Sequence, residues 1–310
     1  MTARKFLCLI PRRIGPGPGA GSARGSKVAL GLAAALVVPI AATGCGSSGE
    51  PSNGALFLAS SPSTGGPSGG HPAGSGWNRH RFLGAFDKHK GTTRTAAPTA
   101  VNALVGAVFT NDASGDHFCT ASVVDSAGQN LIVTAAHCVY DPGVGQRADL
   151  VFVPGYRGGD APNGVWPLAA ITVDQSWAQH GNPDLDVAFA VVQPQGGKQV
   201  QQVLGANKLG IDQGYQLPVK LTGYPSSADS PITCMNTTSR QSATQLRIDC
   251  PDYTGGTSGS PWVTDLDPAT RTGTVVGVIG GYQQGGDTPD TSYSSYFGDA
   301  VQSLYDRATG

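Results

Sequence analysis

Three polar side chains in this sequence have the types that nucleophilic catalysis needs: a serine, a histidine and an aspartate. The serine, Ser258, lies in the run Gly-Gly-Thr-Ser-Gly-Ser-Pro at residues 255–261. A serine hydroxyl is a weak nucleophile until a base removes its proton, and the oxyanion that its attack creates needs backbone N–H donors. Glycines beside the serine let the chain turn tightly enough to aim such donors. Alone, a run of this kind is more often a simple turn. Whether Ser258 is a nucleophile therefore depends on finding a base and an acid elsewhere in the sequence.

The first companion is a histidine at the end of an apolar run. His137 is the seventh residue of Leu-Ile-Val-Thr-Ala-Ala-His-Cys, residues 131–138. A strand end followed by a disulfide-forming cysteine mounts an imidazole rigidly, and a general base must lie within hydrogen-bond reach of the hydroxyl. The other histidines lack this context and lie in loops, at strand edges or outside the β-rich region: His71, His80, His89, His117 and His180. We therefore predict His137 as the base.

The second companion is an acidic group that directly precedes another apolar run. Residues 182–192 read Asn-Pro-Asp-Leu-Asp-Val-Ala-Phe-Ala-Val-Val and contain Asp184 and Asp186. A carboxylate at the start of a strand can be drawn into the interior, where it orients the imidazole and stabilises its protonated form. From chemistry alone, either aspartate fits this role.

Short β-rich runs must position these side chains. From Val101 onward such runs are broken by Gly, Pro, Asp and Asn and recur at a spacing of roughly 8–12 residues, which is typical of a sandwich or barrel. Near the end of the chain, residues 295–309 place apolar side chains near one helical face and predict a short helix. We therefore expect an all-β domain with a C-terminal helix.

The composition agrees with a turn-rich β protein. Of 310 residues only 13% are charged, the net charge is −1, and there are 45 glycines and 22 prolines. Long, charge-laced helices do not fit this composition. Outside the extreme N-terminus no cluster of Lys and Arg offers a surface for nucleic acid, so we expect no nucleic-acid partner.

The N-terminal region carries an export signal. Arg24 and Lys27 precede an apolar run at residues 28–42, and small residues follow. This order of basic, apolar and small residues specifies export. The run is too short for a transmembrane helix, which needs about 20 apolar residues to cross a bilayer. Its ending, Ala-Thr-Gly-Cys, resembles a bacterial lipobox, in which Cys45 would be lipidated; the alternative is cleavage nearby and free secretion. We expect an extracellular or cell-surface protein, with a lipid anchor at Cys45 as its one contact with a membrane.

The chain divides into four segments by composition. Residues 1–45 are the signal peptide, of the lipoprotein type. Residues 46–76 are rich in Ser, Gly and Pro and predict a flexible tether. Residues 77–100 are more basic and mixed, and fit either a propeptide or an arm packed on the domain. Residues 101–310 form the β-rich domain.

Four of the six cysteines lie in the β-rich domain. Cys8 falls in the signal peptide and Cys45 in the lipobox, which leaves Cys119, Cys138, Cys234 and Cys250. Four cysteines in an exported chain suggest two disulfides, with three possible connectivities. Pairing Cys119 with Cys138 and Cys234 with Cys250 closes two short loops, and we predict this pairing. The spacings typical of zinc sites are absent, so we expect no metal and no other cofactor.

Together these motifs resemble those of the trypsin-like serine peptidases, in particular their bacterial glutamyl endopeptidase-like branch. The resemblance covers about residues 101–310. The order His137, Asp186, Ser258 is that of chymotrypsin-like enzymes. In that family an apolar pair directly follows the aspartate, which selects Asp186 over Asp184. Three further stretches match: HFCTASVV at 117–124, LTGYP at 221–225 and VVGVIGG at 275–281.

The resemblance implies two antiparallel six-stranded β-barrels with the active site between them. It implies a serine endopeptidase that hydrolyses protein or peptide substrates through an acyl-enzyme on Ser258, with the amides of Gly256 and Ser258 as the oxyanion hole. It implies no metal requirement. We expect a monomer.

The sequence departs from the family at two positions that matter. Trypsin-type enzymes have an aspartate before the nucleophile, which pairs with a new N-terminus on activation; here that residue is Thr257, so this switch is not expected. Glutamate-specific relatives carry a histidine in the strand that lines the specificity pocket, where this chain has Ile279. We therefore expect that cleavage after glutamate is not dominant.

Two regions are candidates for substrate binding. The backbone of Ile279, Gly280, Gly281 and Tyr282 is expected to pair with an extended substrate, because the glycines permit close approach. Asp252 lies six residues before Ser258, the offset of the acid that binds Arg or Lys in trypsin-like enzymes. A solvated turn acid is the alternative for Asp252, so a preference for Arg or Lys stays open.

Two other functions are weighed against the peptidase. A catalytically silent peptide-binding protein on the same scaffold usually lacks a triad member, and none is missing here. In a lipid-anchored structural or adhesion protein, the Ser/Gly/Pro tether would be the functional part and the triad a coincidence.

Overall fold

Strands make up most of the regular structure of this protein. The computed structural model describes residues 90–110 and 116–310, which all belong to one compact unit. The predicted signal peptide (1–45) with Cys45, the tether (46–76) and the first part of the 77–100 segment lie outside the described residues.

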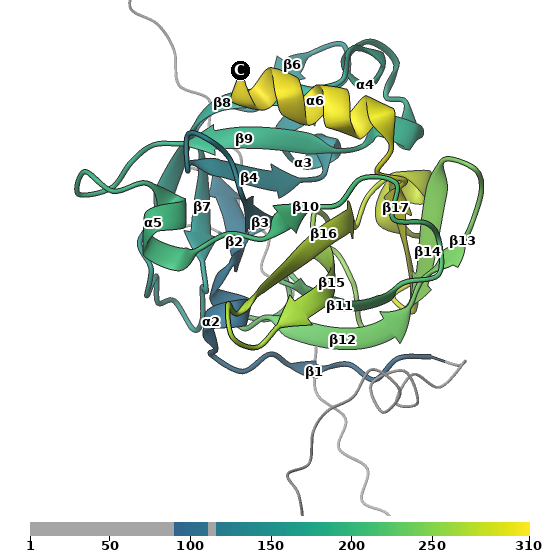
Figure 1. The fold of residues 1–310 in the computed structure, drawn as a ribbon, viewed down its shortest axis with the longest axis horizontal. Coiled ribbons are helices and arrows are strands. Elements are labelled where there is room, and N and C mark those ends of the chain that lie inside the picture. Colours follow the sequence, from purple (N-terminus) through teal and green to yellow (C-terminus); the bar gives the residue numbers. More distant parts are fainter. Residues whose placement is uncertain (1–89, 111–115) are drawn as a thin grey trace, which may run out of the picture. The chain divides into compact units, whose positions relative to one another are not determined.

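The first half of the domain is a closed barrel of six antiparallel strands, in the order β2-β3-β4-β9-β8-β7 (Figure 1). Its strands are short runs rich in β-branched and aromatic residues, which fit a pleated surface with one buried face. They are β2 (Val105–Thr110), β3 (Cys119–Val124), β4 (Leu131–Thr134), β7 (Leu150–Pro154), β8 (Trp166–Val173) and β9 (Ala188–Val192).

The second half is built from a six-stranded and a three-stranded sheet around one core. The larger sheet runs in the order β1-β12-β11-β15-β16-β10, with β1 (Arg94–Thr95), β10 (Lys208–Leu209), β11 (Pro218–Gly223), β12 (Ile232–Thr237), β15 (Pro261–Asp267) and β16 (Thr272–Val278). The smaller runs β13-β14-β17, with β13 (Ser239–Arg240), β14 (Gln245–Asp249) and β17 (Thr291–Ser295). The predicted all-β fold, with a six-stranded antiparallel barrel in its first half, is confirmed. The second half consists of two sheets, and β10 pairs with β16 in parallel.

A shared core joins the two halves. Val133 and Phe189 of the first barrel pack in one buried cluster with Val263 and Val275 of the second half and with Val301. Burying a side chain of this size stabilises the fold by about 1.5–3 kcal/mol. The cluster therefore fixes how the two halves meet, and with it the geometry of any site between them.

The C-terminal helix is α6 (Asp299–Thr309), which begins a few residues later than the 295–309 segment predicted to contain it. It lies along β8 and β9 of the first barrel (Figure 1). The other elements are short: α2 (Ala100–Ala103), α3 (Ala136–Val139), α4 (Gln175–His180), α5 (Val200–Leu204), the 3₁₀ turns η1 (Pro183–Leu185) and η2 (Tyr282–Gly285), and the ribbon of β5 (Tyr140–Asp141) and β6 (Gly145–Gln146).

Two disulfides are present, and they join the pairs that the sequence analysis proposed: Cys119–Cys138 and Cys234–Cys250. The first links β3 to α3, directly beside His137. The second lies under the segment that leads to β1, where a Cβ on Gly91 would come within 2.4 Å of the Cys234 sulfur. Glycine is therefore required at position 91 for the chain to pass over this disulfide.

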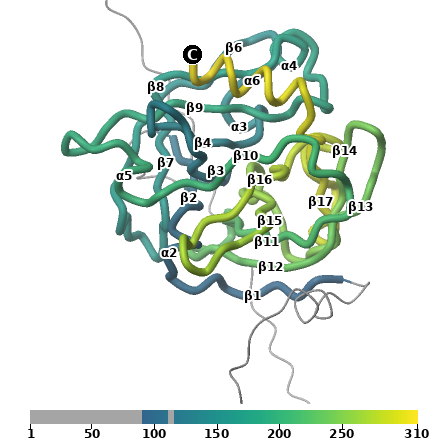
Figure 2. Tube along the Cα trace, in the orientation of Figure 1, coloured from purple at the N-terminus to yellow at the C-terminus, as the bar shows by residue number. Residues whose placement is uncertain are grey.

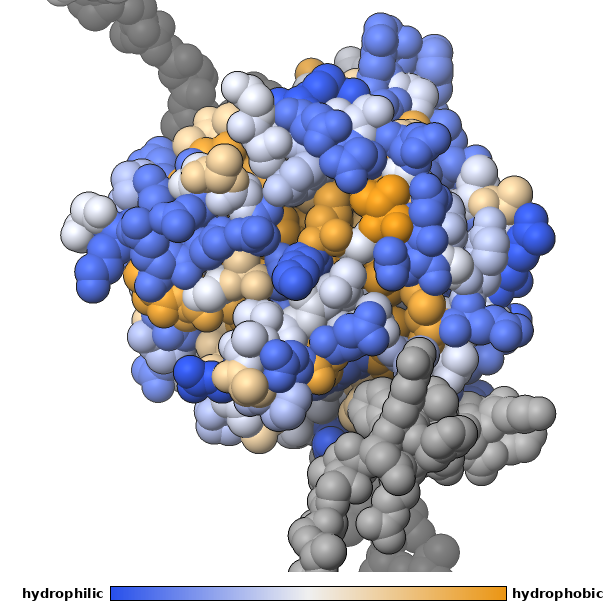
Figure 3. All heavy atoms as spheres, in the orientation of Figure 1, coloured by the Kyte–Doolittle hydropathy of each residue, from blue (hydrophilic) through white to orange (hydrophobic). Residues whose placement is uncertain are grey.

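The chain passes from the first half to the second after β9, through α5 and then β10 (Figure 2). Hydrophilic side chains cover most of the face shown in Figure 3, and hydrophobic ones gather near its middle. Across residues 90–110 and 116–310, no helix combines the length and the hydropathy that crossing a bilayer requires.

Candidate active site

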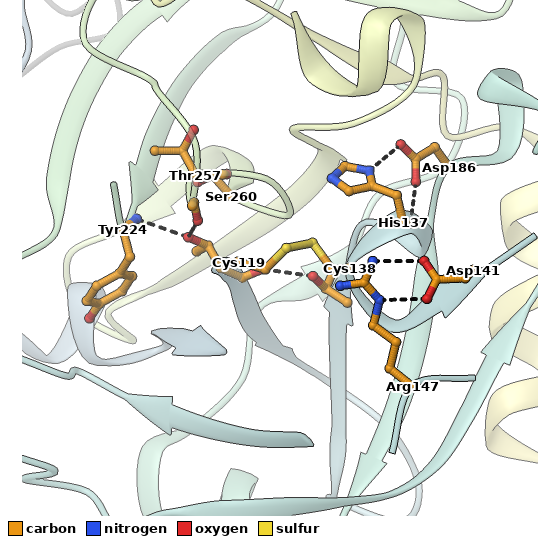
Figure 4. Close-up of a disulfide and its surroundings, with 12 residues drawn as sticks. Cys119, His137, Cys138, Asp141, Arg147, Asp186, Tyr224, Thr257 and Ser260 are labelled. Carbon is orange, nitrogen blue, oxygen red and sulfur yellow. Dashed lines mark hydrogen bonds and ion pairs between the residues drawn. A yellow bond between two sulfur atoms is a disulfide. The ribbon is translucent and has the colours of Figure 1, made fainter. Parts of the chain in front are cut away.

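The ends of two neighbouring strands bring His137 and Asp186 together. β4 and β9 are antiparallel, with Thr134 opposite Ala188. His137 follows β4 in the first turn of α3, and Asp186 precedes β9, so both lie at the same end of the barrel. The Nδ1 atom of His137 is 2.7 Å from Oδ2 of Asp186, and the backbone N–H of His137 donates to Oδ1 at 2.9 Å (Figure 4).

The Asp186 carboxylate is fully buried and accepts a third hydrogen bond. The backbone N–H of Gly281 donates to Oδ2 at 2.9 Å. A buried carboxylate needs such partners, since burying a charge without them is costly. Because Nδ1 of His137 faces a carboxylate that only accepts, it carries the hydrogen, and Nε2 is left as the acceptor. This is the ring orientation that a general base needs.

The competing aspartate points elsewhere. The Oδ1 atom of Asp184 accepts hydrogen bonds from the Thr244 hydroxyl at 2.8 Å and from the Gln245 side-chain amide at 2.9 Å. Asp184 therefore fastens the turn before β9 to the three-stranded sheet, while Asp186 contacts the histidine.

Ser258 lies in the turn between β14 and β15, at the surface between the two halves. Its carbonyl accepts a hydrogen bond from the Thr120 backbone N–H of the first barrel at 2.7 Å. The following residue, Gly259, has φ +82°, and a Cβ there would lie 2.1 Å from the Thr120 carbonyl and 2.3 Å from the Thr134 hydroxyl. The turn can press this closely against the first barrel only because residue 259 is glycine.

The two amides predicted for the oxyanion hole, Gly256 and Ser258, donate no hydrogen bond to any other described residue. In a trans peptide the N–H points opposite to the C=O of the same unit. The Gly255 carbonyl is held by the Ser226 N–H at 2.8 Å, and the Thr257 carbonyl by the Ser260 N–H at 3.0 Å and its hydroxyl at 2.6 Å. Both N–H groups are therefore turned away from these anchors and are available to an oxyanion.

Thr257, the residue before the nucleophile, is buried and bonded within its own turn. Its hydroxyl donates to the Thr254 carbonyl at 2.7 Å, and its N–H donates to the same oxygen at 3.1 Å. The turn therefore obtains its shape from local hydrogen bonds at the position where trypsin-type enzymes have the activating aspartate.

A cavity of about 270 Å³ opens beside Ser258. Its lining comes from residues 253–255 and 284–289, together with Thr257, Ser258 and Ile279. The Ile279 and Tyr253 side chains are only 3% and 5% exposed. The isoleucine has no ionisable group, and burial raises the pKa of Tyr253, so both side chains are uncharged at neutral pH.

The predicted substrate-binding residues differ in how they meet this cavity. Ile279 lines it, whereas Asp252 is exposed, has φ +71° and is absent from the lining. The acid in the lining is Asp287, which is exposed and accepts a hydrogen bond from the Gln283 side chain. Sequence reasoning missed Asp287, because no motif surrounds it.

The amides of Gly280, Gly281 and Tyr282 are already bonded within the domain. They donate to the Tyr293 carbonyl at 3.0 Å, to Asp186, and to the Gln245 side-chain oxygen at 3.1 Å, respectively. The Gly280 carbonyl accepts no hydrogen bond from the described residues. For strand-like pairing with a substrate, this segment therefore offers the Gly280 carbonyl rather than its N–H groups.

One group of potential metal ligands lies in this region. The ligand atoms of Cys119, His137 and Cys138 are within 4.8 Å of one another. Both sulfurs are bonded in the disulfide, so they lack the thiolate form that binds a metal.

The comparisons with known proteins agree with this geometry. No protein-family model and no curated protein matches the chain, but many solved structures do. The protease Anisep from Arthrobacter nicotinovorans is 28% identical with a TM-score of 0.61, over 70% of this chain and 99% of that chain. The thermostable serine protease AL20 from an extremophilic microorganism is 31% identical with a TM-score of 0.60, over 68% and 99%.

A Glu endopeptidase is 19% identical with a TM-score of 0.56, over 72% of this chain and 98% of that chain, which shows the shared fold. The match to AL20, at 31% identity over 99% of that chain, shows membership of the same family as well as a shared fold. The chain belongs to the trypsin-like, chymotrypsin-fold serine peptidases.

Proposed function

We propose that this protein is an exported serine endopeptidase in which Ser258 is the nucleophile, His137 the general base and Asp186 the group that orients it. The observation that carries the proposal is the buried Asp186 carboxylate bonded to both the ring and the backbone of His137. The nucleophile turn with its two unbonded amides supports it further.

In the first half of the proposed reaction, the Ser258 hydroxyl attacks the carbonyl carbon of the scissile peptide bond while His137 Nε2 takes the hydroxyl proton. The resulting oxyanion is stabilised by the N–H groups of Gly256 and Ser258. The imidazolium then gives its proton to the leaving nitrogen, the C–N bond breaks, and the acyl group stays on Ser258.

In the second half, water attacks the acyl-enzyme while His137 again takes a proton. The same two amides stabilise the second oxyanion, and the Ser258 oxygen leaves with the proton that the imidazolium returns. Asp186 keeps the ring in one tautomer throughout, and its negative charge favours the imidazolium in both halves.

For the substrate, we infer that the side chain preceding the cleaved bond enters the cavity beside Ser258. Ile279 provides an apolar wall there and Asp287 adds negative charge at the opening. A glutamate side chain would gain no cationic partner from the lining residues and would be repelled by Asp287. This supports the expectation that cleavage after glutamate is not dominant.

For the location, the predicted signal peptide, the tether and the anchor at Cys45 together suggest a surface-bound or secreted enzyme. Two disulfides support this, because disulfides persist in oxidising compartments. Residues 94–95 pair with β12 and Ala96 is fully buried, which favours an arm that stays packed on the domain for this part of the 77–100 segment.

Covalent labelling with a fluorophosphonate tests the proposal, because this reagent forms an adduct only with an activated serine. We expect one adduct per chain, located at Ser258 by peptide mass mapping and absent from Ser258→Ala. Absence of labelling in wild-type protein with a cooperative thermal unfolding transition would contradict the proposal and favour a silent binding protein on this scaffold.

A further inference from the structure

The HFCTASVV stretch at residues 117–124 contains a buried side chain that the proposed mechanism does not use. Thr120 lies in β3, has no exposed surface, and directly follows Cys119, whose disulfide partner Cys138 directly follows His137. It therefore belongs to the part of the first barrel that holds the general base.

Thr120 is hydrogen-bonded to three other segments. Its hydroxyl donates to the Gly256 carbonyl at 3.0 Å and accepts from the Tyr224 N–H at 3.0 Å. Its backbone N–H donates to the Ser258 carbonyl at 2.7 Å. Its own carbonyl accepts from the Thr134 hydroxyl at 2.8 Å. Every polar group of Thr120 is used.

Two of these bonds act on the residues that carry the oxyanion-hole donors. The Gly256 carbonyl belongs to the peptide unit after the first donor, and the Ser258 carbonyl to the unit after the second. Gly256 has φ +94° and no Cβ, so its backbone rotates at little steric cost unless its neighbours hold it. The Ser226 N–H holds the unit before Gly256, and the Thr120 hydroxyl holds the unit after it.

We propose that the Thr120 hydroxyl is a positioning group for the oxyanion hole. It fixes the Gly256 peptide from the first barrel, so that the donors of the second half keep their place relative to His137. This inference rests on the proposed peptidase function. It predicts that loss of the hydroxyl affects the transition state, where the oxyanion exists, more than substrate binding.

The test compares Thr120→Val, which keeps the shape and loses the hydroxyl, with Thr120→Ser, which keeps the hydroxyl. Thr233→Val is the matched control, because Thr233 is also a buried threonine whose hydroxyl donates to a backbone carbonyl, that of Leu221 at 2.7 Å, with no bond to the nucleophile turn. Turnover of casein and of p-nitrophenyl acetate is measured, together with the rate of fluorophosphonate labelling. Thermal unfolding identifies folded variants, and Thr120→Ala replaces the valine variant if that does not fold.

Removing one oxyanion donor outright costs about 10²–10³ in kcat, and displacing a donor costs less. For Thr120→Val we expect kcat to fall about 10–100-fold, with KM for the ester changed less than about 3-fold. Fluorophosphonate labelling slows by a similar factor, because the phosphoryl oxygen uses the same donors. The pH midpoint of kcat/KM stays unchanged, because the His137–Asp186 pair is untouched. Thr120→Ser and Thr233→Val stay within about 3-fold of wild type.

The inference is wrong if Thr120→Val keeps the kcat of Thr233→Val, if its loss lies in KM alone, or if Thr120→Ser is as slow as Thr120→Val. In each of these cases an active, labelled wild-type enzyme leaves the proposed function standing. A folded wild-type protein that neither turns over these substrates nor reacts with the fluorophosphonate would overturn both.

Discussion

The Asp186 carboxylate accepts a hydrogen bond from the backbone N–H of Gly281, so one buried side chain joins the catalytic histidine to the segment that borders the cavity. Its Oδ2 atom receives both the His137 ring and the Gly281 amide, while Oδ1 receives the His137 backbone N–H. The orientation of the proposed base and the position of the substrate-binding segment therefore depend on the same carboxylate.

Asp186→Asn should be strongly impaired. An asparagine has a single acceptor oxygen, so either Gly281 and the His137 ring or the His137 backbone would face an NH₂ group that cannot accept. When the NH₂ group faces the His137 ring, the imidazole adopts the wrong tautomer, and we expect kcat to fall about 10⁴-fold. The control is Asp184→Asn, in the same turn, which retains an oxygen for Thr244 and Gln245. Comparable losses of kcat in both variants would show that activity depends on the structure of the turn and not on Asp186 as a triad member.

Ser258→Ala should abolish peptide hydrolysis without unfolding the protein, because the change removes one oxygen from a partly exposed side chain. A loss of about 10⁶ in turnover is expected for the nucleophile. Casein hydrolysis and the unfolding midpoint are measured together. Wild-type turnover in purified Ser258→Ala would mean that another residue is the nucleophile.

Much of this site could be predicted from sequence, because the chemistry of the triad restricts residue types within short local segments. Ser258 and His137 each lie in a run that explains their geometry. Which acid lies at the cavity could not be predicted from the sequence, as Asp252 and Asp287 show. The nearness of Asp252 to the nucleophile suggested a pocket acid, yet the chain there has φ +71° and the side chain is exposed.

Asp287 reaches the cavity opening through a turn whose shape depends on tertiary packing. Gln283 and Gln284 both have φ +52°. Residues other than glycine rarely adopt this backbone conformation, and no local sequence pattern predicts it. For the same reason the amides of Gly280–Tyr282 could not be assigned from sequence. They are used within the domain because the segment bends into η2 instead of continuing as a strand.

The disulfide Cys234–Cys250 should contribute mainly to stability. Its cysteines are 16 residues apart, and a loop of this length corresponds to about 3 kcal/mol in the free energy of unfolding. We expect Cys234→Ala/Cys250→Ala to lower the urea midpoint accordingly while a folded fraction stays active. The equivalent change at Cys119 and Cys138 should also lower kcat, because that bond lies beside His137. Equal losses of kcat in the two double variants would contradict this distinction.

The free energy of unfolding should rise as the pH increases above neutrality, because the buried Lys220 ammonium then loses its proton. Burial, together with repulsion from Arg94, lowers the pKa of Lys220 from 10.5 to about 8. Between these values the unfolded chain binds a proton that the folded chain has lost, so the free energy of unfolding rises with pH. The upper limit of the gain is about 3 kcal/mol, since one pKa unit corresponds to about 1.4 kcal/mol.

Urea midpoints of wild type and Lys220→Met at pH 7.5, 8.5 and 9.5 measure this gain as a difference, because tyrosine ionisation is common to both proteins. Lys220→Met should be more stable than wild type at pH 7.5, and the difference should shrink toward pH 9.5. A difference that is independent of pH would show that Lys220 is not the group responsible.

Substrate selectivity can be tested at the two aspartates that are candidates for the acid of the specificity pocket. Asp287 lines the cavity beside Ser258, whereas Asp252 does not, so only a change at Asp287 should alter selectivity. We expect wild-type enzyme, profiled on a peptide library, to disfavour glutamate before the cleaved bond. Asp287→Asn should raise kcat/KM for glutamate about 3–10-fold relative to neutral residues, by removing a like charge from a largely solvated site, where such interactions amount to about 1 kcal/mol. Asp252→Ala, which also removes an exposed acid from the same half of the domain, should leave the profile unchanged. Strong wild-type selectivity for glutamate would refute the argument from Ile279 and Asp287, and a profile altered by Asp252→Ala but not by Asp287→Asn would assign the pocket acid to Asp252 instead.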